Sequence, residues 1–262
     1  MRGLPIGMAA LLPVMLAACG GAQAERVQLS GRSEQRPVAV AAFDKVELKG
    51  PDRVVVRVGG AQSVVMAGDS AVLAEMEVAV EDGRLIVKRR GRSWSVSGSK
   101  EKIIVTVTVP RLAAAAVGGS GEMTVDRVGG GDFKAAVGGS GDLRIGQVQA
   151  GTLEAAVGGS GDLRFDQVAA DSVKMAIGGS GTIEAAGRAR TVEAAIGGSG
   201  DIRASRLESE NAEVAIAGSG TANVHARTLA KIAIAGSGDA EVSGPARCET
   251  SKIGSGSARC GS

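Results

Sequence analysis

Residues 153–165 read Leu-Glu-Ala-Ala-Val-Gly-Gly-Ser-Gly-Asp-Leu-Arg-Phe, and this stretch decides the fold. On both sides of the central Gly-Gly-Ser-Gly, apolar residues alternate with polar or small ones, which is the two-residue period of a β-strand. The glycines let the backbone turn a corner through dihedral angles that other residues avoid. The stretch therefore predicts two short strands joined by a glycine corner.

This pattern recurs eight times between residue 113 and the C-terminus. Successive serines of the motif are 18 to 20 residues apart, and they are Ser120, Ser140, Ser160, Ser180, Ser199, Ser219, Ser237 and Ser255. A nearly fixed period of this length is typical of solenoids, in which each repeat forms one coil. We therefore predict an all-β fold, a single-stranded parallel β-helix with Gly-Ser-Gly coils of 18–20 residues. By analogy with the crossover rule, we expect the coil to be right-handed.

Aligning the repeats on the serine places similar residues above one another. Three residues after the serine, the residues form an apolar column: Met123, Leu143, Leu163, Ile183, Ile202, Ala222, Ala240 and Ala258. Six residues before it, they form a column of mostly alternating charge: Lys134, Glu154, Lys174, Glu193, Glu213 and Lys231. Stacked strands lie about 4.8 Å apart, so we expect the first column in the core and the second on an outer face. The second would favour the correct register of the coils.

The N-terminus has the features of an export signal. Arg2 precedes a 15-residue apolar run over residues 4–18, which is shorter than the roughly 20 residues of a membrane-spanning helix. Leu16-Ala17-Ala18-Cys19 resembles the lipobox of bacterial lipoproteins, so we expect cleavage before Cys19 and lipid attachment to it. Ordinary cleavage after Ala24, which would discard Cys19, is the alternative. The expected location is the outer membrane, the periplasm or the cell surface.

Residues 37–112 also alternate as strands, but without a tight period. We interpret them as wider, irregular coils that continue into the repeats. The expected organisation is a lipoprotein-type signal peptide over 1–18, a tether over 19–36 and one β-helix over 37–262. Within the β-helix, 37–112 form irregular N-terminal coils and 113–262 form the eight regular repeats.

Two cysteines remain when Cys19 is set aside. An exported chain meets an oxidising compartment, so this even number suggests a Cys248–Cys260 disulfide that closes the last coil. Cys260 falls in the inward column of Phe165. Cys248 falls in the inward column of Leu153 in one alignment but faces outward in another. Two free thiols are the alternative.

The composition excludes several classes of function. Lys and Arg total 30 against 28 Asp and Glu, too balanced for a nucleic-acid binder that neutralises phosphates. Aromatic residues make up 2% of the chain and His225 is its one histidine, which argues against aromatic stacking sites and histidine chemistry. We expect no cofactor and no nucleic-acid partner.

Three motifs are candidate sites. Ser120 has a glycine two residues before it but Glu122 two residues after it, so the motif is not a nucleophile elbow and we expect no catalytic residue. Asp142 and Asp162 are weak metal candidates as neighbours in adjacent coils, although a structural role is favoured because calcium rolls repeat every nine residues. A basic loop is the third motif, and its residues are Arg89, Arg90, Arg92 and Trp94. It is either a ligand patch for acidic polymer or lipid headgroups, or a solvated hairpin tip.

Three stretches and the repeated Gly-Ser-Gly-Asp steps point to one family. The stretches are Phe43-Asp44-Lys45-Val46, Val80-Glu81-Asp82-Gly83-Arg84-Leu85 and Val107-Thr108-Val109-Pro110-Arg111-Leu112. With them the sequence resembles, over about residues 38–262, the head GIN domain of auto-transporter adhesins, a bacterial envelope family. The resemblance implies a β-helical envelope protein with adhesion as its suggested role, and it supplies no catalytic residues.

These observations predict a non-enzymatic, exported envelope protein. We expect it to recognise an envelope or extracellular polymer, such as a polysaccharide, by many weak contacts along an extended surface. Its membrane contact would be the lipid on Cys19. One alternative is a scaffolding protein that self-associates; a second is a polysaccharide-active enzyme that uses paired carboxylates.

Overall fold

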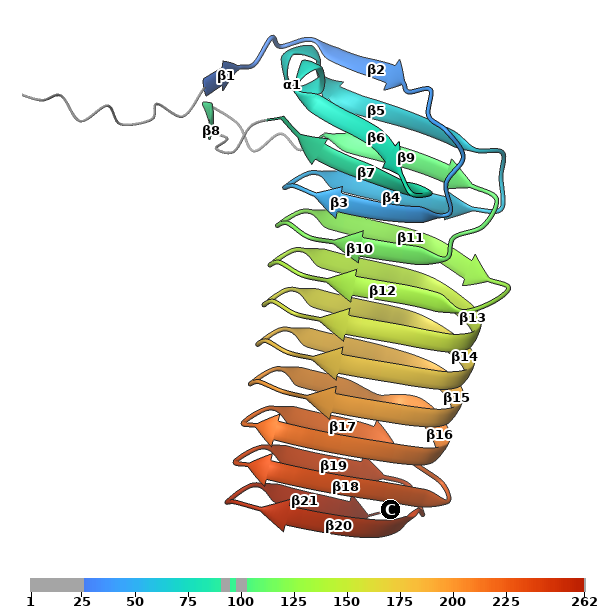
Figure 1. Cartoon of the computed structure of the whole chain (residues 1–262), viewed down its shortest axis with the longest axis vertical. Helices are drawn as coiled ribbons and strands as arrows, with labels where there is room; N and C mark the ends of the chain where they lie inside the picture. Colours follow the sequence, from blue (N-terminus) through green and yellow to red (C-terminus); the bar gives the residue numbers. More distant parts are fainter. Residues whose placement is uncertain (1–25, 91–94, 98–102, 262) are drawn as a thin grey trace, which may run out of the picture.

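The computed structural model describes residues 26–90, 95–97 and 103–261, which form a β-solenoid with the N-terminal elements at one end and the C-terminus at the other (Figure 1). Cys19, Arg92 and Trp94, for which predictions were made above, lie outside the described residues. Consecutive repeats pair in parallel and in register, as Leu143 with Leu163 and Glu154 with Lys174. The predicted fold class, an all-β parallel solenoid, is confirmed.

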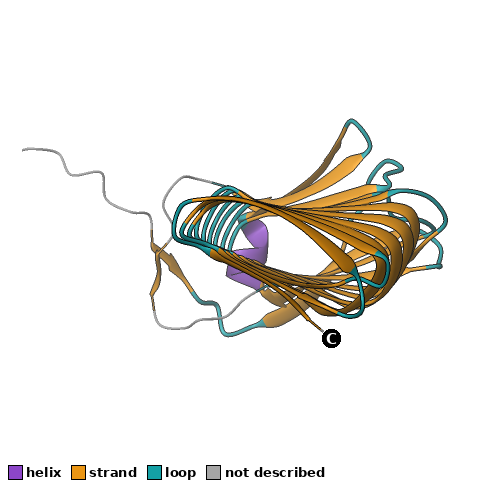
Figure 2. Cartoon of the chain, turned by 90° about the horizontal axis from the view of Figure 1, so that it is seen from below, coloured by secondary structure: helices purple, strands orange, loops and turns teal. Residues whose placement is uncertain are grey.

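The coils of the repeats form one wrapped sheet with two faces, which meet at the glycine corner (Figure 2). Face A, before the corner, contains β3 (Lys45–Lys49), β10 (Ala114–Val117), β12 (Phe133–Val137), β18 (Leu229–Gly236) and β20 (Arg247–Ile253). Face B, after the corner, contains β4 (Arg53–Val58), β11 (Glu122–Gly129), β17 (Thr221–His225), β19 (Asp239–Ser243) and β21 (Ser257–Gly261). Four long strands begin on face B and bend round to end on face A: β13 (Asp142–Val157), β14 (Asp162–Ile177), β15 (Thr182–Ile196) and β16 (Asp201–Gly218).

The core lies between the two faces, because alternate side chains of every strand point inward. The predicted apolar column is buried from Met123 to Ala240, and only Ala258, in the last coil, is half-buried. Phe165 and Leu153 are no more than 1% exposed. The inward positions are therefore filled by side chains, so the groups that a ligand could contact lie at the outward positions of the two faces.

The second and fourth residues of each corner motif must be glycine because successive coils touch there. A Cβ at Gly161 would overlap the carbonyl oxygen of Gly141 in the preceding coil. A Cβ at Gly158, the first residue of the motif, would meet nothing within 4 Å. Later coils also tolerate a Cβ at the first position of the motif, which is Ala217 in one coil and Ala235 in the next. The close stacking is held by backbone hydrogen bonds, such as Ser160 N–H to Gly139 O at 3.0 Å.

The N-terminal region departs from the predicted irregular coils. Strands β7 (Arg84–Arg89) and β9 (Ile104–Val109) do form a coil, which pairs in parallel with β3 and β4. Antiparallel strands cover this coil, however: β2 (Ser33–Pro37), β5 (Ser63–Asp69) and β6 (Met76–Glu81), with the short helix α1 (Ser70–Ala74). A separate two-stranded sheet joins β1 (Arg26–Gln28) to β8 (Ser95–Ser97). The interpretation of 37–112 as coils is therefore correct for only part of the segment, and residues 33–36 of the expected tether belong to β2.

The order of the coils along the solenoid also differs from their order in the sequence. Strands β3 and β4 pair with β7 and β9 on one side and with β10 and β11 on the other. The coil of residues 45–58 therefore lies between two segments that follow it in the chain. These pairings make the cap and the repeats one continuous structure.

Candidate ligand-binding surface

The predicted basic patch does not form as expected, because Arg89 is committed to the interior. Its side chain is 6% exposed and its guanidinium pairs with Asp52, which is fully buried. Nε of Arg89 lies 2.8 Å from Asp52 Oδ2, and Ile103 N–H donates to Asp52 Oδ1 at 3.0 Å. This corrects the assignment of Arg89 to a ligand patch: the residue ties the cap coil to the corner at Asp52. Arg90 is exposed.

Asp142 and Asp162 lie at equivalent exposed positions of adjacent coils, as their spacing predicted. Among the residues described, no group of three or more His, Cys, Asp or Glu side chains is placed to hold a metal ion. We assign no site to this pair.

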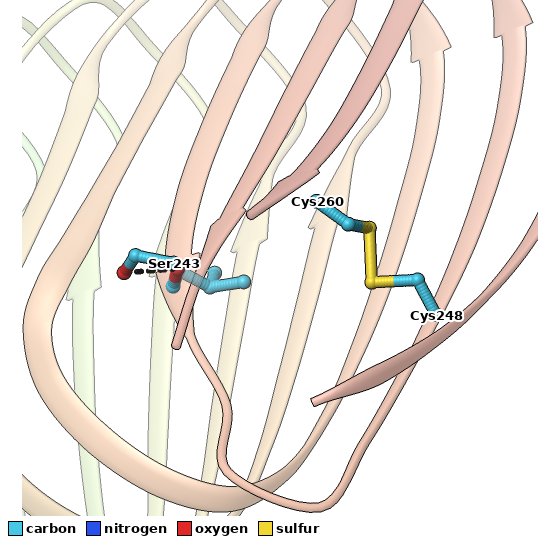
Figure 3. The surroundings of a disulfide bond; sticks show 4 residues. Ser243, Cys248 and Cys260 are labelled. Carbon is cyan, nitrogen blue, oxygen red and sulfur yellow. Dashed lines mark hydrogen bonds between the residues drawn. A yellow bond between two sulfur atoms is a disulfide. The ribbon is translucent and has the colours of Figure 1, made fainter. Parts of the chain in front are cut away.

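Cys248 and Cys260 form a disulfide across the last coil, with Cα atoms 6.5 Å apart (Figure 3). Cys248 pairs with Ala230, and Cys260 pairs with Val242. Both partners are buried, so both cysteines occupy inward columns. The alignment that placed Cys248 in the column of Leu153 is the one that the register shows.

The charged column on face A lies on the outside. Lys134 Nζ and Glu154 Oε2 are 2.7 Å apart, and Lys174 Nζ and Glu193 Oε2 are 3.8 Å apart. The hydrogen bond from Lys134 to Glu154 raises the pKa of the lysine. These side chains are 46–68% exposed, so each pair contributes little to stability. Their regular spacing leaves a flat face of charged groups.

Face B carries a hollow of about 430 Å³ at its end near the N-terminal cap. Its floor is formed by Val55, Thr124 and Gly146. The hollow exists because Gly146 stands between Asp126 and Asp166 in one outward column and carries no side chain. A Cβ there would lie 2.5 Å from the backbone oxygen of Asp126, so the gap cannot be filled without moving the backbone.

Four charged side chains surround this floor: Arg57, Asp126, Arg144 and Asp166. Oδ1 of Asp126 accepts hydrogen bonds from the backbone N–H of Val58 at 2.9 Å and of Arg127 at 2.7 Å. Arg57 is exposed and has neither an ion pair nor a side-chain hydrogen bond within the described ranges. The rim therefore holds a fixed carboxylate beside a guanidinium that is free to bind.

Asp166 is fixed by two arginines. It accepts from Nε of Arg144 at 2.9 Å and from Nε of Arg164 at 3.0 Å. Burial raises the pKa of Asp166, but the hydrogen bonds from Arg144 and Arg164 outweigh this and hold the pKa below its ordinary value. The carboxylate therefore remains ionised at neutral pH and orients Arg144 at the rim.

The family model described as "Putative auto-transporter adhesin, head GIN domain" matches residues 42–246. The chain therefore belongs to this family of adhesin-like proteins, as the sequence predicted. No curated protein sequence matches it. In the described part of the chain, no helix has the length and apolar character needed to cross a bilayer.

Solved structures from Parabacteroides share the fold. A "putative adhesin" from Parabacteroides distasonis superposes with a TM-score of 0.82 at 24% identity, covering 90% of this chain and 100% of that one. A "putative lipid binding protein" from the same species has a TM-score of 0.82 at 22% identity, covering 91% and 100%. A "putative adhesin" from Parabacteroides merdae has a TM-score of 0.80 at 21% identity, also covering 91% and 100%. At these identities the likeness shows the fold alone.

The hollow on face B is not among the sites predicted from the sequence. Its signal was present: Gly146 is the glycine in a column whose neighbours are Asp126 and Asp166, outside any corner motif. A glycine inside a strand often marks a close backbone approach. Recognising the gap required the register of three coils, which the alignment on serine already provided.

Proposed function

We propose that this protein is exported, held at the membrane by a lipid on Cys19, and binds an extended polysaccharide of the envelope or surroundings without chemically changing it. The observation that supports the proposal most is the geometry of the two faces. Outward side chains repeat once per coil, at the strand spacing of about 4.8 Å, on a rigid surface. A polymer that lies along such a surface can make many weak contacts, which add up through multivalency.

The adhesin-like family supports binding as the role. Among the described residues, the carboxylates with shifted pKa values are Asp69, Asp166 and Asp239, and in each of them the pKa is lowered. A general acid in glycoside hydrolysis needs a shift in the opposite direction. This disfavours the enzyme alternative for these three residues.

The ends of the solenoid disfavour an end-to-end scaffold. Antiparallel strands cover the first coil, and the last coil carries a disulfide and charged residues. The inward columns are filled by buried side chains such as Phe165, which leaves an acyl chain no room between the faces at these positions. Binding at the outer faces is the reading that fits both features.

Binding is tested by affinity electrophoresis of the purified mature protein in native gels containing dextran, yeast mannan or polygalacturonate. We expect at least one polysaccharide to slow the protein while its chain length stays unchanged. A protein unaffected by all three, or one that releases new reducing ends, contradicts the proposal. Intact mass spectrometry tests the anchor: an unacylated chain that begins after Ala24 would remove Cys19 from it.

A further inference from the structure

The hollow on face B has the dimensions and rigidity of a subsite within a larger binding surface. Its volume of about 430 Å³ falls in the range of small-ligand pockets, which is about 300–1,000 Å³. Gly146 and its neighbours fix the floor through backbone contacts, and Asp126 and Asp166 are fixed by the hydrogen bonds described above. Preformed polar groups of this kind reduce the ordering cost of binding.

The charges around the hollow indicate what kind of molecule it suits. Among the lining residues, Arg57 and Arg144 contribute two positive charges, and Asp126 and Asp166 contribute two negative ones. Both carboxylates are already paired, Asp126 with Arg127 and Asp166 with Arg144 and Arg164. An anion would meet two carboxylates, and a cation would meet two guanidinium groups. An uncharged ligand avoids both conflicts and can use donors and acceptors at the same time.

The remaining hydrogen-bonding capacity points to hydroxyl groups. A guanidinium offers five N–H donors, and a carboxylate offers about four lone-pair sites. Arg57 uses none of its donors among the described residues. Asp126 accepts hydrogen bonds through Oδ1, and its Oδ2 lies 3.9 Å from Nε of Arg127, an ion pair longer than a hydrogen bond. A hydroxyl both donates and accepts, so neighbouring hydroxyls on one ring can serve Arg57 and Asp126 together. Val55 and the methyl group of Thr124 give the floor an apolar part that suits C–H groups of the ring.

We propose that this hollow binds one uncharged sugar unit of a glycan, with Arg57 donating to and Asp126 accepting from its hydroxyls. The inference rests on the proposed function, because it names the unit that one part of face B would hold. It adds that the sugar is neutral and that Arg57 is a specificity-determining contact.

The test compares variants in native gels that contain dextran, yeast mannan or polygalacturonate. Arg57→Ala removes the free donor, and Thr124→Gln extends a side chain over the floor. Arg203→Ala is the matched control, because Arg203 lies on the same face, is exposed and pairs only with Asp201 in the described structure. Far-UV circular dichroism confirms that each variant is folded.

We expect the wild type and Arg203→Ala to bind dextran or mannan equally, and Arg57→Ala and Thr124→Gln to bind at least about tenfold more weakly, the scale of a lost hydrogen bond to a charged group. Retention of wild-type binding to the neutral polysaccharide by both hollow variants overturns the subsite and leaves the proposed function intact. Binding only to polygalacturonate likewise overturns the neutral-sugar assignment alone. If the wild type binds none of the three, both the proposed function and the subsite are wrong.

Discussion

Lys252 occupies, in the last coil, the inward position that Ile234 occupies in the coil before it. Ile216 and Ile234 are buried, whereas Lys252 is exposed at the open end. Thr250 follows Ile232 in the same way. An inward-pointing charge on an edge strand hinders pairing with another chain. The final coil therefore keeps the repeat geometry while ending the apolar columns.

Replacing the charge of Lys252 is expected to leave an edge strand that can pair with another chain. Lys252→Ile with Thr250→Ile restores two apolar columns at the open end, so we expect concentration-dependent self-association. Sedimentation velocity over a hundredfold range of protein concentration measures it. Lys231→Ile is the control, because Lys231 points outward on face A and is exposed. A double variant that stays monomeric, like the control, would show that Lys252 does not protect the edge.

The corner glycines are expected to differ in their tolerance of alanine. Gly161→Ala forces a methyl group against the Gly141 carbonyl oxygen, and we expect it to lower the free energy of unfolding by about 1–3 kcal/mol or more. Gly158→Ala meets open space, and its effect should stay within about 0.5 kcal/mol. Urea unfolding of the two variants provides the comparison. Equal losses would mean that the stacking of coils does not impose the motif.

The buried Asp52–Arg89 pair is expected to hold the cap on the repeats. Asp52→Asn removes the buried carboxylate that pairs with the Arg89 guanidinium and accepts from Ile103 N–H, so we expect a loss of about 3–5 kcal/mol in unfolding free energy. Glu154→Gln, which breaks an exposed pair with Lys134, should cost no more than about 1 kcal/mol. Differential scanning calorimetry of both variants measures the contrast. An Asp52→Asn protein as stable as Glu154→Gln would remove the pair from the account of the cap.

Acid is expected to weaken the cap through Asp69. Burial raises the pKa of Asp69, but hydrogen bonds from Ser30, Ala71 and Gly31 outweigh it and lower the pKa below its ordinary value. A depressed folded-state pKa gives stability that is complete above the unfolded-state pKa of about 3.9 and is lost as the pH falls through the folded-state value. Wild type should therefore exceed Asp69→Ala in urea midpoint at pH 7, and the gap should narrow below about pH 4. A gap that stays constant down to pH 2 would contradict this linkage.

The repeats could be predicted because every structural requirement in them is local and periodic. The overlap at Gly161 recurs in each coil, and the inward column of Leu163 follows from counting residues from the serine. The register of Cys248 followed from the same count once the correct alignment was chosen.

The cap could not be predicted in the same way because its pairings are non-periodic. The sequence contains one signal, since the Asp82-Gly83 pair between two strands favours an antiparallel hairpin. In the structure both residues have the positive φ that such a turn needs, 49° and 71°. Interpreted only as a turn, the pair does not predict the antiparallel pairing of β6 with β7 that the structure shows. The contact between Asp52 and Arg89 spans 37 residues and leaves no spacing pattern in the sequence.

The position of the 45–58 coil between two later segments has a consequence for biogenesis. When this segment leaves the ribosome, neither of its neighbours has been synthesised. One of its edges stays unpaired until β9 has emerged at about residue 109, and the other until about residue 125. Contiguous repeats further along the chain need only the preceding copy as a template. The first coil to be synthesised is therefore completed late, and a chain truncated before β11 would leave the edge of β4 that pairs with β11 open to its surroundings.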